Sequence, residues 1–272
     1  MEKFIRAAGI PVRVVTQGDQ HPHDRAVVLL HGYLETLEVW DDLAKALGRH
    51  IYTVMPDLPG HGLSGTHPEI NTMEFIADVV ADVQQQLGIA KVLLVGHSMG
   101  GYAALALARK YPQQTAGLCL FHSTPNADSD EKRINRDREI DLFLAEKRDL
   151  LFKTTLPNMF APQNLQRMQN RIEELQGALQ MVDNSGIIAC IRGMAAREDM
   201  NDFLVSFKQP LLFIFGKNDV YISWETAQAL MQKFPQAQTA VLENSGHCGF
   251  YEEPAASAEA LIAWVTNTEV KK

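Results

Sequence analysis

The sequence has too few cysteines for a disulfide framework or a cysteine-based metal site. It contains three, Cys119, Cys190 and Cys248, at unrelated spacings. Small secreted domains carry even numbers of cysteines, and structural zinc sites repeat short cysteine spacings. We therefore expect three reduced thiols, as in a cytoplasmic protein. Cys119 lies inside an apolar run and is expected to be a small core residue.

Long apolar runs and an excess of positive charge are also missing. No run approaches the roughly 20 residues of a membrane helix, and the first residues, MEKFIR, lack the apolar segment of a secretory signal. The formal net charge is −8, whereas nucleic-acid binding calls for a basic patch. We expect a cytoplasmic protein with neither a membrane nor a nucleic acid as partner.

What is present is a regular alternation of short apolar runs and amphipathic segments. The helix predicted over 71–87 has Asn71 as its N-cap and ends at Gly88. The first two strands would form a hairpin that turns at residues 9–11. This alternation predicts an α/β fold with a mostly parallel, eight-stranded sheet and helices on both faces. The predicted strands are 4–6, 12–15, 26–30, 51–55, 91–95, 117–121, 210–215 and 239–242.

The strand pattern stops after the sixth predicted strand. From 124 to 207 the sequence is helical in character, and residues 128–149 are dense in mixed charge, which is typical of a solvated helix face. We expect a helical lid over 124–207, inserted into a core formed by 1–123 and 208–272. Because ligands in such sheets bind outside the carboxyl ends of the strands, a lid inserted there would cover the binding site.

Residues 96–100, GHSMG, carry the clearest chemical signal. They fit G-x-S-x-G, in which a serine occupies a sharp turn between a strand and a helix, and small neighbours allow the two elements to approach. A predicted strand precedes the motif, and strong helix formers follow it. The positive end of the helix dipole would lie beside the serine. The pattern predicts that Ser98 is a nucleophile, and an ordinary tight turn is the alternative.

A serine nucleophile needs a base, and the base needs a group that orients it. Among nine histidines, His247 fits best because it follows the last predicted strand and glycines flank its short loop. Asp219 follows the strand over 210–215, so it would also lie at a carboxyl end of the sheet. His122 is a second-rank base. The alternatives are a surface-turn role for His247 and a simple helix-terminal role for Asp219.

Other polar residues near these motifs are expected to be structural. His31 and His61 lie in glycine-flanked loops and would donate or accept structural hydrogen bonds. His97 precedes the serine and would point away from it, because neighbours on a tight turn diverge. Asp57 would brace the turn at 59–62.

An acyl-transfer transition state requires donors for its oxyanion. One donor should be the backbone N–H of Met99, the residue after the nucleophile. The second should come from the loop after the strand over 26–30. There we predict the N–H of Tyr33, with that of Leu34 as the alternative.

Taken together, the motifs make the sequence resemble the α/β-hydrolase superfamily over about 26–122 and 210–266. The order Ser98, Asp219, His247 is the order in that family. The chain is most similar to lid-bearing, single-domain carboxylesterase-like members, a group often named after pimeloyl-carrier-protein methyl ester esterases. The matching stretches are HGY at 31–33, DLPGHGLS at 57–64, GHSMGG at 96–101, GKND at 216–219 and GH at 246–247.

Three differences from other members of this superfamily narrow the class of enzyme that the sequence resembles. A serine at position 98, in place of aspartate, argues against epoxide hydrolases and dehalogenases. The loop beginning at His31 lacks the HGGPG of proline iminopeptidases. Tyr102 stands where the menaquinone-pathway lyase of this fold usually has an arginine.

The resemblance implies a serine hydrolase that cleaves a small or medium carboxylic ester through an acyl-enzyme, with no metal or organic cofactor. Alternatives are thioester or carbon–carbon hydrolysis, acyl transfer, a lyase step, or a ligand-sensing protein with slow turnover. The oligomeric state and the role of Cys248 stay open. Four arginines of the predicted lid could bind a substrate carboxylate: Arg133, Arg136, Arg192 and Arg197. Candidate substrate-binding residues are Leu34, His122, Phe152, Met159, Phe160, Met194 and Tyr221.

Overall fold

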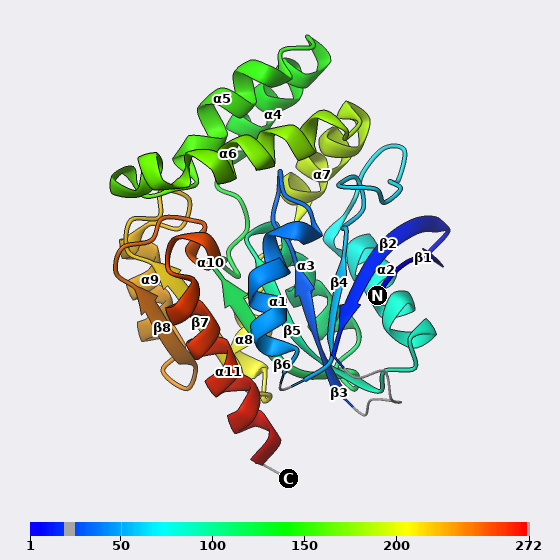
Figure 1. The fold of residues 1–272 in the computed structure, drawn as a ribbon, viewed down its shortest axis with the longest axis vertical. Helices are drawn as coiled ribbons and strands as arrows, with labels where there is room; N and C mark the ends of the chain where they lie inside the picture. The colour runs from blue at the N-terminus through cyan, green and yellow to red at the C-terminus, as the bar shows by residue number, and fades with distance from the viewer. Residues whose placement is uncertain (19–24, 50, 271–272) are drawn as a thin grey trace.

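A computed structural model describes residues 1–18, 25–49 and 51–270 of the chain. Its eight strands form one sheet in the order β1-β2-β4-β3-β5-β6-β7-β8 (Figure 1). The β1–β2 and β2–β4 pairs are antiparallel, and the other five pairs are parallel. This confirms the predicted mostly parallel, eight-stranded sheet. The strands are β1 Glu2–Ala7, β2 Ile10–Gln17, β3 Arg25–Leu30, β4 Thr53–Pro56, β5 Lys91–His97, β6 Thr115–Phe121, β7 Leu211–Gly216 and β8 Gln238–Leu242.

The hairpin of β1 and β2 turns one residue earlier than predicted. Ala7 pairs with Ile10, so the turn consists of Ala8 and Gly9 alone. Both have positive φ, 45° and 89°, as two-residue hairpin turns require to match the twist of the strands. The predicted turn at 9–11 is therefore wrong. Pro11 lies within β2, opposite the edge strand.

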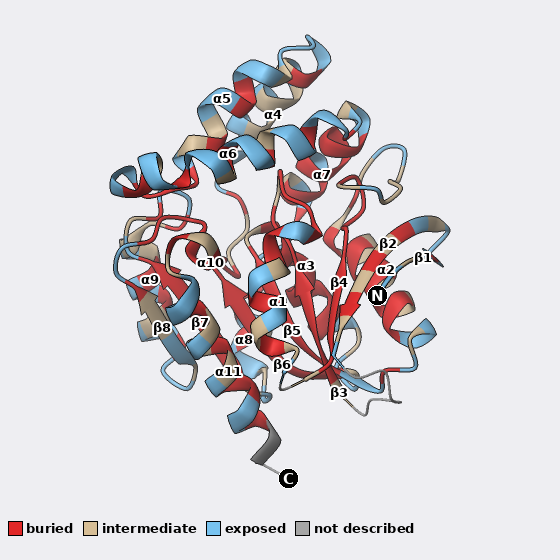
Figure 2. Ribbon diagram, in the orientation of Figure 1, coloured by how far each residue is buried: buried red, intermediate tan, exposed pale blue. Residues whose placement is uncertain are grey.

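Helices cover both faces of the sheet. The helices α1 and α11 contact each other in front of the sheet in Figure 1, and α2 and α3 contact each other behind it. Figure 2 shows the central strands almost wholly buried between them, and Cys119 on β6 is one of the fully buried residues. These core helices are η1 Leu37–Trp40, α1 Asp41–Leu47, α2 Met73–Gln86, α3 Met99–Lys110, α9 Trp224–Lys233, α10 Gly249–Glu252 and α11 Pro254–Val270.

Helix α2 is capped by Thr72 rather than by the predicted Asn71. The Thr72 hydroxyl accepts the N–H of Phe75 at 3.0 Å. The Asn71 side chain instead accepts the N–H of His67 at 3.0 Å and donates to the carbonyl of Pro59 at 3.2 Å, so it ties the preceding loop together. Past the other end of the helix, Gly88 has a φ of 70°, as predicted for a terminating glycine.

Between β6 and β7 lie residues 124–207, all of them described, which contain helices and no strand. We call this part of the chain the helical segment. In Figure 1 its helices α4 to α7 stand beyond the carboxyl ends of the parallel strands. Of the helices in the described part of the chain, none is both long and apolar enough to span a membrane. The helical segment comprises α4 Asp130–Leu144, α5 Arg148–Asn158, η2 Pro162–Asn164, α6 Leu165–Gln180, α7 Asn184–Ala196 and α8 Asn201–Ser206.

Candidate active site

Ser98 occupies a sharp turn between β5 and α3. Its φ and ψ are 49° and −115°, a conformation that L-residues rarely adopt and that places strain at the turn. A Cβ atom on Gly96 would lie 2.4 Å from the carbonyl oxygen of Gly100, and one on Gly100 would lie 2.2 Å from that of Leu30. The spacing G-x-S-x-G is therefore a steric requirement of this strand-to-helix connection.

Asp219 and His247 form a buried hydrogen-bonded pair beyond the ends of β7 and β8. His247 Nδ1 lies 2.7 Å from Asp219 Oδ2. The other carboxylate oxygen accepts the backbone N–H groups of Tyr221 at 2.8 Å and Ile222 at 3.1 Å. Burial by itself would raise the pKa of Asp219, but the interactions with His247 and His122 outweigh it and hold that pKa well below its usual value. Asp219 is thus fixed as an acceptor for the imidazole.

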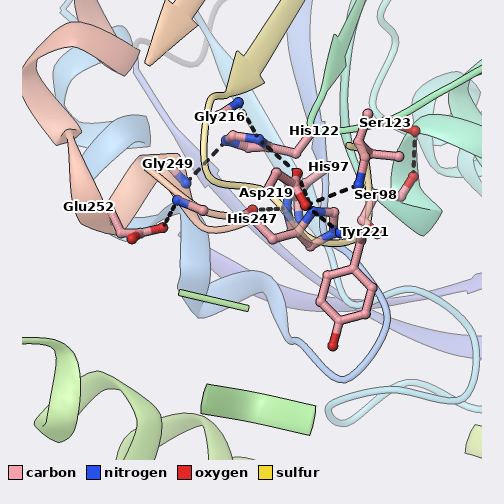
Figure 3. A network of polar contacts seen from close by, with 12 residues as sticks. His97, Ser98, His122, Ser123, Gly216, Asp219, Tyr221, His247, Gly249 and Glu252 are labelled. Atoms are coloured by element: carbon pink, nitrogen blue, oxygen red, sulfur yellow. Dashed lines mark hydrogen bonds and ion pairs between the residues drawn. The ribbon is translucent and has the colours of Figure 1, made fainter. Parts of the chain in front are cut away.

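The loops that carry Ser98, Asp219 and His247 meet at one edge of the sheet. They follow β5, β7 and β8, which are joined through parallel pairs and so end on the same side. Ser98 and His247 border the same cavity, of about 260 Å³. Figure 3 shows Asp219 and His247 in close contact, with Ser98 drawn in the same network. The structure therefore brings together the three residues that the sequence singled out.

His122 lies beneath this pair and links the two loops. Its Nδ1 lies 3.1 Å from the backbone nitrogen of Gly216 and 3.3 Å from Asp219 Oδ2, and its Nε2 lies 3.2 Å from the backbone nitrogen of Gly249 (Figure 3). Burial lowers the pKa of His122 to about 4 despite the carboxylate. The ring is fully buried and does not border the cavity, so its position suits loop positioning rather than substrate binding.

His97 points away from Ser98, as predicted, and supports the loop that carries His247. Its Nδ1 lies 2.9 Å from Glu35 Oε2, and its Nε2 lies 2.7 Å from the carbonyl oxygen of His247. Both partners are acceptors, so both ring nitrogens donate and the imidazole carries a positive charge. Burial opposes this charge, but the Glu35 carboxylate outweighs burial and raises the pKa of His97. Glu35 also accepts the N–H of Gly32 at 2.6 Å.

The remaining polar residues of the site loops have structural partners, as predicted. His31 Nε2 accepts the N–H of Leu58 at 2.8 Å, and His61 Nε2 accepts that of Leu34 at 3.3 Å. The Asp57 carboxylate accepts the N–H groups of Leu37 at 2.9 Å and Leu63 at 3.0 Å. These bonds fix the loops on either side of the 57–64 turn.

Two backbone N–H groups of the site loops are not engaged by the described part of the protein. The N–H of Leu34 is directed to His61, whereas the N–H groups of Tyr33 and Met99 have no acceptor among the described residues. Met99 opens α3, where the first N–H groups lack intrahelical partners. Of the two residues considered for the second donor, Tyr33 is therefore the one whose N–H is not engaged by the protein as described.

Of the seven predicted substrate-binding residues, four border the cavity: Leu34, Met159, Met194 and Tyr221. Three do not. Phe152 is fully buried in the helical segment, where its ring packs against that of Phe143 with centroids 6.1 Å apart. Phe160 is also buried away from the cavity, and His122 lies beneath Asp219. In the sequence, the apolar character of Phe152 and Phe160 is equally compatible with the core of the helical segment and with the lining of a pocket.

Apart from Arg136, which was considered for carboxylate binding, the sequence reasoning missed one wall of the cavity, which α4 provides. The α4 residues that border it are Lys132, Asn135, Arg136 and Glu139. Their spacing of three, four and seven residues places them on one face of the helix, and that periodicity is the signal that could have found them. Their polarity instead suggested a solvated surface.

One group of metal-ligand types exists among the described residues, and it belongs to this site. The donor atoms of His122, Asp219 and His247 lie within 4.8 Å of one another. Asp219 Oδ2 and His247 Nδ1 are already paired, and N–H donors face both ring nitrogens of His122. The arrangement suits a hydrogen-bond network rather than a metal centre.

The fold and this site define the class of the protein. The family model described as the alpha/beta hydrolase fold matches residues 25–254, and the chain belongs to this family. It is an enzyme, a carboxylesterase-like hydrolase of this fold.

Individual relatives agree with this class. A pimeloyl-[acyl-carrier protein] methyl ester esterase of Vibrio parahaemolyticus is 26% identical, over 84% of this chain and 89% of its own. A thermophilic esterase from Thermogutta terrifontis, solved with malate bound, has a TM-score of 0.91 at 28% identity, with 98% and 99% of the two chains covered. An enol-lactonase from Burkholderia xenovorans shares the fold, with a TM-score of 0.89 at 22% identity and 97% and 100% coverage.

Proposed function

We propose that the protein hydrolyses a small or medium carboxylic ester through an acyl-enzyme formed on Ser98. The observation that carries this proposal is the 2.7 Å hydrogen bond between Asp219 and His247 beside the cavity that Ser98 also borders. Esterase names among the relatives support the reaction class. The three residues have the roles of nucleophile, base and orienting acid that a serine hydrolase requires.

The proposed reaction has two halves. His247 takes the proton of the Ser98 hydroxyl as Ser98 attacks the ester carbonyl, and then gives that proton to the departing alcohol. Water next attacks the acyl-enzyme with the same base, which releases the acid and restores Ser98. Asp219 stabilises the imidazolium that forms in each half, because its depressed pKa keeps it ionised.

The backbone N–H groups of Met99 and Tyr33 would stabilise the oxyanion in both halves. They are free of other acceptors in the described structure, and Met99 lies at the positive end of the α3 dipole. Preorganised donors of this kind are the largest single contribution in many acyl-transfer enzymes.

We further propose that the helical segment, 124–207, acts as a lid and sets the size of the substrate. Three of its helices line the cavity, through Arg136 on α4, Thr155 on α5 and Met194 on α7. The cavity volume of about 260 Å³ lies just below the range of about 300–1,000 Å³ that is common for small-molecule sites. A small ester is the substrate that fits such a volume.

The test compares Ser98→Ala with a matched control, Ser206→Ala, on a series of p-nitrophenyl esters of increasing acyl length. Ser206 is exposed on α8 and bonds only within its own helix. The wild type and the control should hydrolyse the shorter esters, whereas Ser98→Ala should lose kcat by a factor on the order of 10⁶. Equal activity of Ser98→Ala and the control would refute Ser98 as the nucleophile.

A further inference from the structure

The four arginines considered for carboxylate binding have different surroundings. Arg133 is half-exposed and lies 3.6 Å from Asp130 on its own helix, away from the cavity. Arg192 is exposed and donates to the carbonyl of Glu69 at 3.0 Å. Neither is available to a ligand in the cavity beside Ser98.

Arg197 is buried, and its guanidinium is fully engaged by the protein. It donates to the carbonyl oxygens of Asn126 and Met194 at 2.8 to 3.2 Å. Its Nη1 also lies 2.7 Å from Asp128, and the guanidinium stacks 3.9 Å from the centre of the Tyr102 ring. Arg197 therefore has a structural role.

Arg136 differs because it borders the cavity and most of its donors are unused. Its Nε donates to Asp128 Oδ2 at 2.5 Å, whereas its two Nη groups have no acceptor among the described residues. The side chain is 15% exposed, so the protein has largely removed this cation from water. A half-buried guanidinium whose Nη groups have no protein acceptor needs a ligand or water to supply one.

The charge around Arg136 is not balanced by the protein. Asp128 is shared with Arg197, so one carboxylate faces two guanidinium groups. Lys132 also borders the cavity and makes no ion pair with a described residue. The opposing charge on the same face of α4 is Glu139, whose pKa is raised by burial although Arg136 lowers it. The α4 wall therefore carries more positive than negative charge.

We infer that the cavity takes an ester that bears a free carboxylate, and that the Nη groups of Arg136 bind that carboxylate. This inference rests on the proposed function, because it places the ester carbonyl at Ser98 and the carboxylate at α4. A planar guanidinium pairs with a carboxylate through two parallel hydrogen bonds, a geometry that a lysine cannot reproduce. The loops that carry Ser98 and His247 would then cleave the ester, and α4 would select esters that bear a carboxylate.

The test uses two pairs of esters that differ only in the carboxylate. Monomethyl glutarate against methyl pentanoate places the charge on the acyl side. The butyryl ester of glycolic acid against ethyl butyrate places it on the alcohol side. For each pair, the ratio of kcat/KM for the charged ester to kcat/KM for the neutral ester is measured in the wild type, Arg136→Gln and the matched control Arg133→Gln.

In at least one pair of esters, Arg136→Gln should lower this ratio by about tenfold or more, because hydrogen bonds between charged groups are stronger than those between neutral groups. Arg133→Gln should leave the ratio unchanged. Unchanged ratios in both pairs for a folded Arg136→Gln would overturn the inference. Free glutarate should competitively inhibit the wild-type enzyme on ethyl butyrate, and absence of inhibition overturns the inference even if Arg136→Gln does not fold. Failure of the wild type to hydrolyse any of the four esters would instead contradict the proposed function.

Discussion

The two walls of the cavity are held in different ways. The sheet-side wall consists of loops in which His97, His122, Asp219 and His247 are buried and bonded to one another or to backbone groups. The opposite wall is α4, whose buried hydrophobic content is limited to Phe143 and whose polar face borders the cavity. A rigid, buried network suits a reaction that needs fixed geometry, whereas a charged helix can vary without disturbing that geometry. Changes on the sheet side should therefore affect turnover, and changes on α4 should affect substrate choice.

The sharpest test of the sheet-side wall is Asp219→Asn. The amide keeps the size of the side chain but favours the wrong imidazole tautomer, so kcat should fall by a factor on the order of 10⁴. Steady-state kinetics on a neutral ester measures this loss, with Asp202→Asn, an exposed acid on α8, as the control. A silent Asp219→Asn would show that another acid orients the base.

A second test removes the charge that holds His97. Glu35→Gln breaks a buried ion pair, and breaking such a pair costs about 3–5 kcal/mol in the free energy of unfolding. Denaturant unfolding at several pH values measures the effect. Glu259→Gln, an exposed carboxyl on α11, is the matched control and should be neutral.

The pH dependence of the wild type follows from the same pair. The pKa of His97 is raised above its usual 6.5, so its contribution is complete below pH 6.5 and is lost as the pH rises through the folded-state value. The pKa of Glu35 is lowered from 4.5, so its contribution is present above pH 4.5 and is lost as the pH falls through its folded-state value. Glu35→Gln should reduce the change in the free energy of unfolding with pH on both the acidic and the alkaline side. If the variant keeps the wild-type profile, the pair does not carry the charge assigned to it.

The smallest expected effect concerns a contact between the sheet-side wall and the helical segment. The Tyr221 hydroxyl donates to the carbonyl of Thr155 on α5 at 3.3 Å, and this bond joins the Asp219 loop to the helical segment. Because the bond is partly exposed, Tyr221→Phe should cost about 1 kcal/mol or less in thermal unfolding. A loss of several kcal/mol would mean that the helical segment is held much more tightly to the core than its contacts indicate.

The two walls also differ in how far the sequence predicts them. The turn at Ser98 and the positions of Asp219 and His247 follow from glycine spacing and from strand ends, which are local features. The cap at Thr72 and the turn at Ala8 were missed by one residue, because neighbouring residues can satisfy the same local requirement. Which charged residues of α4 border a cavity depends on what packs opposite them, and a solvated face has the same composition. Arg136 could therefore be placed only by the structure.

The most direct test of the proposed chemistry is the site of covalent modification. The wild-type protein is treated with one equivalent of a fluorophosphonate, digested and mapped by peptide mass spectrometry. If Ser98 is the nucleophile that His247 and Asp219 activate, the adduct lies on the peptide that contains Ser98 and is absent from Ser98→Ala. An adduct on a different serine, or labelling that persists in Ser98→Ala, would contradict this assignment.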